Sequence, residues 1–230
     1  MIDLQGFGAQ LAVGTLLTVE LAFASLGVGL VLGLLGAGAK LSRSRVLRFV
    51  GEAYTTLVRG VPELLVVLIV FFGASIALQS IASALGYDGY VEFSPFVAGI
   101  IALGLTFGAY ATEVFRGAFQ AVPKGQAEAA RAIGMNRWTT FHRILLPQVW
   151  RYALPGLGNL FLVLLKDTSL ISVVGLEELM RKSAIAVSFT KEPFTFYLAA
   201  AVIYLAMTAI SMGGIHLLER RAERGVRRAA

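Results

Sequence analysis

Long stretches without a charged residue recur along the chain and alternate with short clusters of charge. Three of them, 64–87, 93–112 and 193–218, hold 24, 20 and 26 residues without Asp, Glu, Lys or Arg. Two more are interrupted by only one or two charged residues. A helix needs about 20 apolar residues to cross a hydrocarbon core of about 30 Å. The pattern predicts five membrane spans, near 11–38, 62–85, 95–115, 152–175 and 195–218.

The same stretches predict helices rather than strands. Backbone N–H and C=O groups cannot stay unpaired in lipid, and a helix pairs them within one segment. The alternation of apolar and polar residues that marks a membrane β-barrel is missing. We therefore expect an all-α fold, a single polytopic helix bundle formed by residues 1–230. Small residues that let membrane helices approach closely recur in two spans: Gly27, Gly29, Gly33 and Gly36, then Gly99, Gly104 and Gly108.

The composition supports a membrane protein and excludes several other classes. The chain is 57% hydrophobic and 15% charged, whereas about 25% charged residues is usual in soluble domains. Such hydrophobicity excludes a disordered chain. The absence of Cys excludes a disulfide scaffold, a thiolate metal site and a Cys nucleophile. Two isolated histidines, His142 and His216, do not predict a metal site, and no catalytic residue is assigned.

The basic residues predict the orientation in the membrane. Of the 20 Lys and Arg residues, 16 fall in the segments 40–59, 116–151 and 220–228. Basic loops stay in the cytoplasm, so the N-terminus is expected in the periplasm and the C-terminus in the cytoplasm. The Arg-rich tail is expected to anchor on lipid headgroups of the inner leaflet, and no nucleic-acid partner is needed to explain it. The other loops are mainly acidic, through Asp3, Asp88, Glu92, Glu177, Glu178 and Glu192.

The two predicted outer loops differ in length and character. Residues 86–94 are rich in turn formers, whereas 176–192 is polar and of mixed charge, as in a short helix lying along the outer surface.

The cytoplasmic segment 116–151 is longer than a simple connection needs. Pro123 predicts a helix start, Gly134 fits the left-handed position after a helix, and Asn136 can cap a second helix, which Pro147 would end. Met135 and Trp138 are expected near the corner between the two helices, where exposed Met and aromatic residues are typical of a partner interface. The alternative is an amphipathic hairpin that rests on the inner leaflet.

This segment resembles the EAA motif of permease subunits of bacterial ATP-binding cassette importers. Glu128, Ala129 and Ala130 are followed after three residues by Gly134 and after nine more by residues 144–147, Ile-Leu-Leu-Pro. Four further segments resemble the polar amino-acid branch, in particular the Q-type permeases of histidine/lysine/arginine/ornithine and opine uptake: residues 36–41, 55–62, 115–119 and 151–156.

The resemblance implies a type I importer permease fold with a coupling region at 120–147 that docks on an ATPase. It implies two ATPase subunits, which bind ATP and Mg, a second permease of the M type, and a periplasmic amino-acid-binding protein. It implies transport of basic amino acids or opines, with glutamine or glutamate as the alternative. No G-x-x-x-x-G-K-[ST] phosphate loop occurs in the sequence, so we expect a subunit without enzymatic activity of its own. The residues that the resemblance places at the ATPase are Glu128, Ala129, Ala130, Gly134, Met135 and Trp138.

Charged residues inside a span are candidates for the substrate pathway, since each costs about 2.5–3.5 kcal/mol at the bilayer centre on insertion scales. Lys166 and Asp167 lie within the fourth predicted span, followed by the hydroxyls of Thr168 and Ser169. Asp167 could accept from an ammonium or guanidinium group, and Lys166 could hold a carboxylate. The alternative is that both pair with Glu20 or with a partner subunit and only fix helix packing.

Three other charged sites complete the predictions. Glu20, in the first span, is expected to face the bundle interior, in either a functional or a structural role. Arg59 and Glu63 flank Pro62 at an i, i+4 spacing that allows pairing, although Pro62 disrupts the turn between them. A kinked, polar helix start could gate the substrate pathway at Arg59, and the alternative is that Arg59 only reaches the membrane interface. Glu113 and Arg116 are expected to form an i, i+3 pair.

Two other classes of protein were weighed against an importer subunit. A secondary transporter usually has more spans and an internal repeat, which this sequence lacks. A membrane scaffold does not explain charges within the fourth span.

Overall fold

The computed structural model describes residues 4–87, 89 and 91–223. Asp3, Asp88 and the tail residues Arg224, Arg227 and Arg228, which entered the orientation argument, lie outside this range. Five helical segments are long and apolar enough to cross a membrane, which confirms the predicted count. They are α1 (Gly8–Leu41), α3 (Glu63–Ala84), α4 (Pro95–Ala121), the segment Arg137–Val174, and α9 (Pro193–Ala222).

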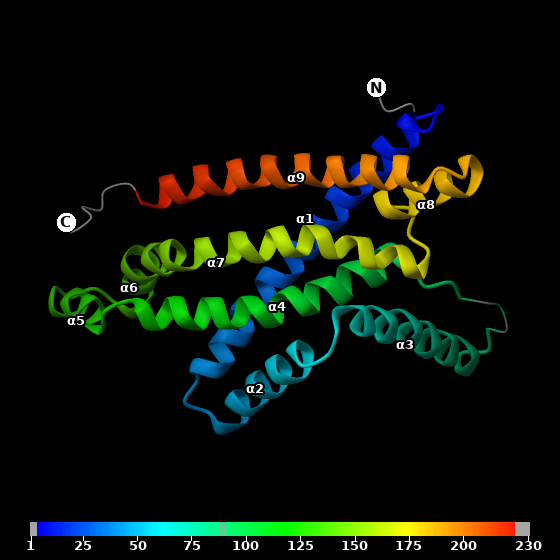
Figure 1. Cartoon of the computed structure of the whole chain (residues 1–230). Helices are drawn as coiled ribbons and strands as arrows, with labels where there is room; N and C mark the ends of the chain where they lie inside the picture. The colour runs from blue at the N-terminus through cyan, green and yellow to red at the C-terminus, as the bar shows by residue number, and fades with distance from the viewer. Residues whose placement is uncertain (1–3, 88, 90, 224–230) are drawn as a thin grey trace.

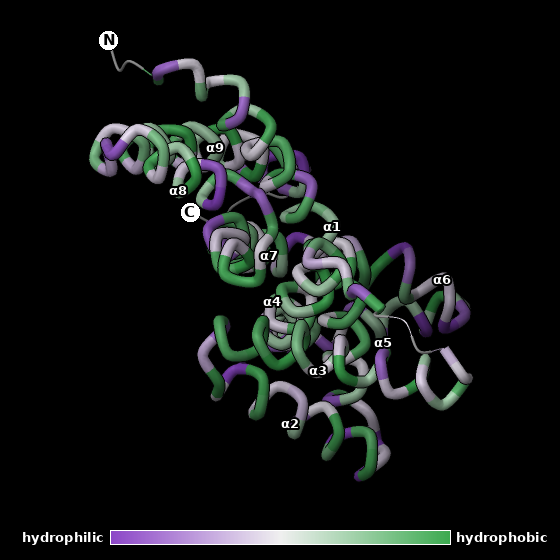
Figure 2. Tube along the Cα trace, turned by 90° about the vertical axis from the view of Figure 1, so that its right-hand side faces the viewer, coloured by the Kyte–Doolittle hydropathy of each residue, from purple (hydrophilic) through white to green (hydrophobic). Residues whose placement is uncertain are grey.

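Shorter helices join the spans. α5 (Lys124–Ala132) and α6 (Arg137–Thr140) lie at one end of the bundle and α8 (Leu179–Thr190) at the other, while α2 (Arg45–Arg59) runs obliquely below the bundle between the end of α1 and α3 (Figure 1). The helix α8 confirms the short helix predicted within 176–192. Coloured by hydropathy, the long helices are mainly hydrophobic, and hydrophilic residues gather at their ends and in α6 (Figure 2).

The fourth span differs from the prediction at Pro147. Pro147 does not end a helix: α6 continues through a π-helical segment, Phe141–Leu145, into α7 (Leu146–Asp167) and then into a 3₁₀ segment, Thr168–Val174. In the π segment the Leu146 N–H bonds the carbonyl of Phe141. Pro147 then stands in the first turn of α7, where a missing N–H costs little.

The helix α1 crosses the bundle and packs along α4 more extensively than any other pair of described helices. Small residues face each other along this contact. A Cβ built on Gly29 would lie 2.5 Å from Phe107, and one on Gly33 would lie 2.7 Å from Ala111. Since neither backbone could come so close with a side chain at these positions, the glycines set the spacing of the two helices.

A buried carboxylate joins three helices at the opposite end of the bundle from α5 and α6. Glu178 is fully buried and caps α8, accepting from the N–H groups of Met180 and Arg181 at 2.9 Å each. The hydroxyls of Thr18 in α1 and Tyr204 in α9 donate to it at 3.4 and 3.3 Å. One side chain thereby holds α1, α8 and α9 together.

Adding one methyl group at Gly36 is expected to lower the free energy of unfolding by about 1–3 kcal/mol, the usual cost of overpacking. The new Cβ of Gly36→Ala would lie 2.2 Å from Oγ1 of Thr112. The matched control is Gly38→Ala, whose Cβ meets nothing within 4 Å and which gains helix propensity. Denaturant unfolding of the purified chain in micelles measures both, and equal effects would contradict the α1–α4 packing described above.

Glu178 is expected to make stability depend on pH. Burial raises the pKa of its carboxyl above the ordinary 4.5, and hydrogen bonds oppose this only in part. The folded protein then keeps the proton to higher pH than the unfolded chain, so stability falls as pH rises through the interval above 4.5. Glu178→Gln should flatten this fall in thermal unfolding followed against pH.

The matched control for that measurement is Glu177→Gln. Lys182 lowers the pKa of the exposed Glu177 below its ordinary 4.5, so removing this carboxyl should lower stability by a constant amount above that pH and change the pH dependence only below it. A pH dependence unchanged by Glu178→Gln would contradict the assignment.

Candidate functional site

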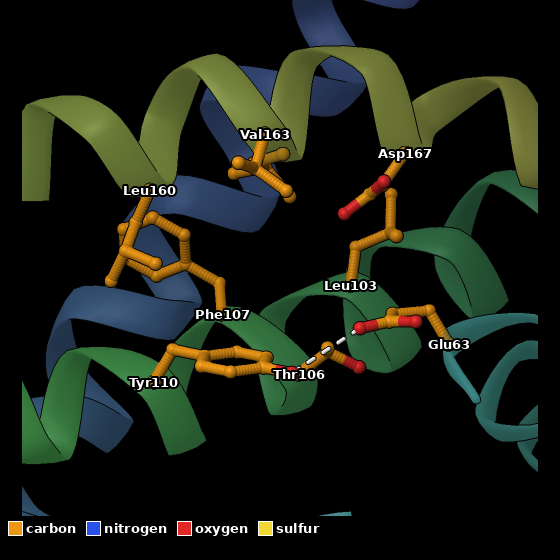
Figure 3. Close-up of a pocket in the computed structure, with 9 residues that line it drawn as sticks. Glu63, Leu103, Thr106, Phe107, Tyr110, Leu160, Val163 and Asp167 are labelled. Carbon is orange, nitrogen blue, oxygen red and sulfur yellow. Dashed lines mark hydrogen bonds between the residues drawn. The ribbon is translucent and has the colours of Figure 1, made fainter. Parts of the chain in front are cut away.

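A cavity of about 250 Å³ lies between α3, α4 and α7. Its wall is apolar except for the carboxyl groups of Glu63 and Asp167 and the hydroxyls of Thr106 and Tyr110. Figure 3 shows the carboxyl groups of Asp167, from α7, and Glu63, from α3, on the same side of this space. The lining residues are Glu63, Leu103, Thr106, Phe107, Tyr110, Leu160, Val163, Leu164 and Asp167.

None of the described residues that line this cavity is basic. Glu63 stands in the first turn of α3, where the positive end of the helix dipole stabilises a carboxylate. Asp167 is the last residue of α7, brought to the cavity from 104 positions further along the chain. Glu63 and Asp167 are both half-buried, so in this largely apolar space the two carboxylates repel each other and lose part of their solvation. The arrangement is therefore complementary to a cation with hydrogen-bond donors.

Tyr110 occupies one end of the cavity and is held on two sides. Its hydroxyl donates to Oε1 of Glu63 at 3.4 Å (Figure 3), and the guanidinium of Arg59 lies 5.1 Å from the centre of its ring. The ion pair that the spacing of Arg59 and Glu63 allows is not found among the described residues. Arg59 ends α2 and Glu63 begins α3, so the i, i+4 geometry of one continuous helix does not apply, and each residue contacts Tyr110 instead.

A second, polar cavity of about 570 Å³ lies on the other side of Tyr110, between α1, α2 and α4. Lys40 is bound there by Glu113 and by Glu52, the latter at 2.7 Å, and it donates to Thr55 at 3.0 Å. Arg116 contacts Glu113 at 2.7 Å, which confirms the predicted i, i+3 pair. Through Lys40 this network ties α2 to the end of α1 and to α4.

Tyr54 attaches α2 to α4 by a separate contact. Its hydroxyl donates to the backbone carbonyl of Leu105 at 2.7 Å. Burial raises the pKa of Tyr54 to about 12, so the hydroxyl remains a donor throughout the physiological range.

The residues predicted for a substrate pathway are only partly brought together. Asp167 lines the apolar cavity, and Arg59 borders it through Tyr110. Lys166 is exposed on the outside of α7. Thr168 and Ser169 donate their hydroxyls to the carbonyls of Leu165 and Lys166, both at 2.7 Å, and do not line the cavity.

The expectation that Glu20 faces the interior of this bundle is wrong. Glu20 is exposed, and no pairing with Lys166 or Asp167 is found among the described residues. The reason is the packing of α1, whose small and buried residues, Thr18, Leu21, Ala22 and Ser25, face inward and turn Glu20 outward.

Sequence reasoning missed Glu63, Thr106 and Tyr110 as members of one site. Thr106 and Tyr110 are polar positions within the uncharged run 93–112, and they lie four residues apart, on one face of a helix. That spacing was the available signal. The approach of α3 and α7, which completes the site, has no local signature in the sequence.

The predicted corner between α5 and α6 forms as a Schellman motif. Gly134 has φ +82°, its N–H bonds the carbonyl of Arg131, and the N–H of Met135 bonds that of Ala130, both at 3.0 Å. Asn136 caps α6 by accepting from the N–H of Thr139 at 2.8 Å. These bonds confirm the roles predicted for Gly134 and Asn136.

The corner presents a mixed surface. Glu128 and Ala129 are exposed, Ala130 is buried against the bundle, and Met135 is half-buried. Trp138 is 72% exposed, with its ring 3.9 Å from that of His142, and the neighbouring Ile133 is 79% exposed. Large apolar side chains left in the open at a rigid corner are suited to a protein partner. The ATPase-coupling role of these residues stays a prediction.

Known proteins resemble the chain over nearly its whole length. The family described as binding-protein-dependent transport system inner membrane component matches residues 11–224. The nopaline transport system permease protein NocQ of Agrobacterium fabrum is 52% identical over 96% of this chain and 94% of its own. The histidine/lysine/arginine/ornithine transport system permease protein HisQ of Escherichia coli is 48% identical over 98% of this chain and 99% of its own.

Solved structures show the same fold. A crystal structure of an amino acid ABC transporter with histidines contains a chain that is 32% identical, with a TM-score of 0.78 over 93% of this chain and 94% of that one. An inward-facing structure of the MetNI methionine ABC transporter, 17% identical, matches with a TM-score of 0.74 over 94% of this chain and 98% of that one.

Proposed function

The chain belongs to the binding-protein-dependent transport system inner membrane components, and we propose that it is the permease subunit of an ATP-driven importer of basic amino acids or opines. The observation that carries the substrate class is the pair Glu63 and Asp167, which line an apolar cavity with no basic residue among its described lining.

The chemistry of this cavity favours a cationic substrate. A guanidinium or ammonium group donates several charge-assisted hydrogen bonds to carboxylates, and the methylene stem of a basic amino acid suits the wall of Leu160, Val163 and Leu103. The side chain of glutamine carries no cation to pair with these carboxylates, and the side chain of glutamate would add a further negative charge. The names of NocQ and HisQ, which refer to nopaline and to histidine, lysine, arginine and ornithine, agree with this choice.

The corner between α5 and α6 and the family support the proposed partners. This surface would dock on one of two ATPase subunits, which bind ATP and Mg, while a periplasmic binding protein delivers the amino acid. A second permease of the M type would complete the pathway. The half-open cavity and the little-buried helix α3, whose one buried residue is Val67, leave a face for that subunit.

The orientation is proposed from charge. The corner between α5 and α6, which belongs to a basic segment, lies at the opposite end of the bundle from α8 (Figure 1). With that end in the cytoplasm of a bacterial inner membrane, the N-terminus is periplasmic and the C-terminus cytoplasmic. ATP-driven closure of the ATPase pair would then move the corner and switch the bundle between outward-open and inward-open states. The loaded binding protein would shift the equilibrium between these two states.

Asp167→Asn tests the substrate class directly. In proteoliposomes with the full importer, its binding protein and ATP, arginine uptake is expected to fall by about 10- to 100-fold, the loss typical of a charge-assisted hydrogen bond. Assembly should be unaffected, and the ranking of arginine over glutamine should weaken. The matched control is Lys166→Gln, at the exposed neighbour outside the cavity. An unchanged ranking in Asp167→Asn would remove Asp167 from the site.

Glu128→Lys tests the coupling corner. The exposed carboxylate becomes a cation, so the ATPase should no longer co-purify and ATP-dependent uptake should be lost, while membrane insertion stays normal. Gln126→Lys places the same charge elsewhere on α5 and should retain both activities. Normal uptake by Glu128→Lys would refute the docking role.

A further inference from the structure

Tyr110 is the one residue that lines both the apolar cavity and the polar cavity, as their described linings stand. It projects from α4, which packs closely on α1: a Cβ on Gly108, two residues away, would lie 2.7 Å from Leu32. The ring therefore stands on a fixed support between two compartments.

The two compartments carry opposite chemistry. The apolar cavity holds the acidic pair Glu63 and Asp167. The polar cavity holds the basic residues Lys40, Arg59 and Arg116. Lys40 and Arg116 are neutralised by Glu52 and Glu113. Arg59 has no carboxylate within ion-pair distance among the described residues, and its guanidinium lies over the Tyr110 ring.

The contacts that hold Tyr110 come from both sides of the short non-helical joint between α2 and α3. Arg59 is the last residue of α2 and Glu63 the first of α3, with Gly60, Val61 and Pro62 between them. A relative movement of α2 and α3 would therefore release the ring face and the hydroxyl together. The opening between the two cavities at Tyr110 is therefore coupled to the geometry of the short, non-helical joint between α2 and α3.

We propose that Tyr110 is the barrier between the apolar cavity, which holds the substrate, and the polar cavity, which we call the vestibule and which faces the cytoplasm. Arg59 is the resident cation that closes this barrier. A basic amino acid leaving the cavity displaces Arg59 from the ring, because its own ammonium or guanidinium group makes the same cation–π contact. Tyr110 thus acts as a positioning residue that favours cationic cargo at the exit. This inference rests on the proposed function and orientation.

The absence of Cys from the sequence allows a direct test. In the full importer, Thr106→Cys places a reporter in the apolar cavity and Thr56→Cys places one in the vestibule. Inside-out vesicles are treated with 2-(trimethylammonium)ethyl methanethiosulfonate, a permanently charged thiol reagent, and the labelling rate is measured with the native Tyr110, with Tyr110→Ala and with Tyr110→Phe.

The cysteine introduced by Thr56→Cys should react rapidly with the reagent in every background. The cysteine introduced by Thr106→Cys should react slowly when Tyr110 is native. Tyr110→Ala should raise the rate at Thr106→Cys by about tenfold, the change expected when contacts of this strength are lost. Tyr110→Phe keeps the ring and the Arg59 contact and should raise it less. Should Tyr110→Ala fail to assemble, Arg59→Gln provides the same comparison, again with faster labelling expected.

Equal labelling of Thr106→Cys in all backgrounds would overturn the barrier. A second arm separates this outcome from failure of the proposed function: arginine should slow labelling of Thr106→Cys in the Tyr110→Ala background, whereas citrulline, its uncharged analogue, should not. Loss of that protection alone would count against the substrate class and leave the barrier in place.

Discussion

The structure depends on one electrostatic constraint: two carboxyl groups share an apolar space without a basic neighbour in its wall. Glu63 and Asp167 reach this cavity from α3 and α7, and bringing unpaired carboxylates into such surroundings costs free energy. A permanent ion pair would remove that cost and would also remove the capacity to bind a cation. The unpaired state is therefore what a site for a passing cationic solute requires.

The rest of the fold positions the helices that carry the residues of this cavity. Glycines along α1 let it pack tightly on α4, which fixes Thr106 and Tyr110. The carboxylate of Glu178 joins α1, α8 and α9 at one end of the bundle, and Lys40 joins α1, α2 and α4 at the other. The non-helical joint between α2 and α3 reaches the cavity through Glu63, the first residue of α3.

Features encoded within one segment were predictable from the sequence. The uncharged runs gave the five spans, and the turn residues Gly134 and Asn136 placed the corner, since a left-handed glycine and an N-cap are decided by local chemistry. Contacts between distant segments were not predictable. The cavity brings Glu63 and Asp167 together from helices whose approach depends on packing. Glu20 faces outward because the small residues of α1 lie on the opposite face, which packs against the bundle.

The most direct measurement of the central claim is calorimetric binding of arginine and of citrulline to the purified importer without its binding protein. The two solutes have nearly the same shape and differ in the charge of one end. The carboxylate pair predicts that arginine binds at least about tenfold more tightly and that this preference weakens as salt is raised. Equal affinity for the two solutes would contradict the account.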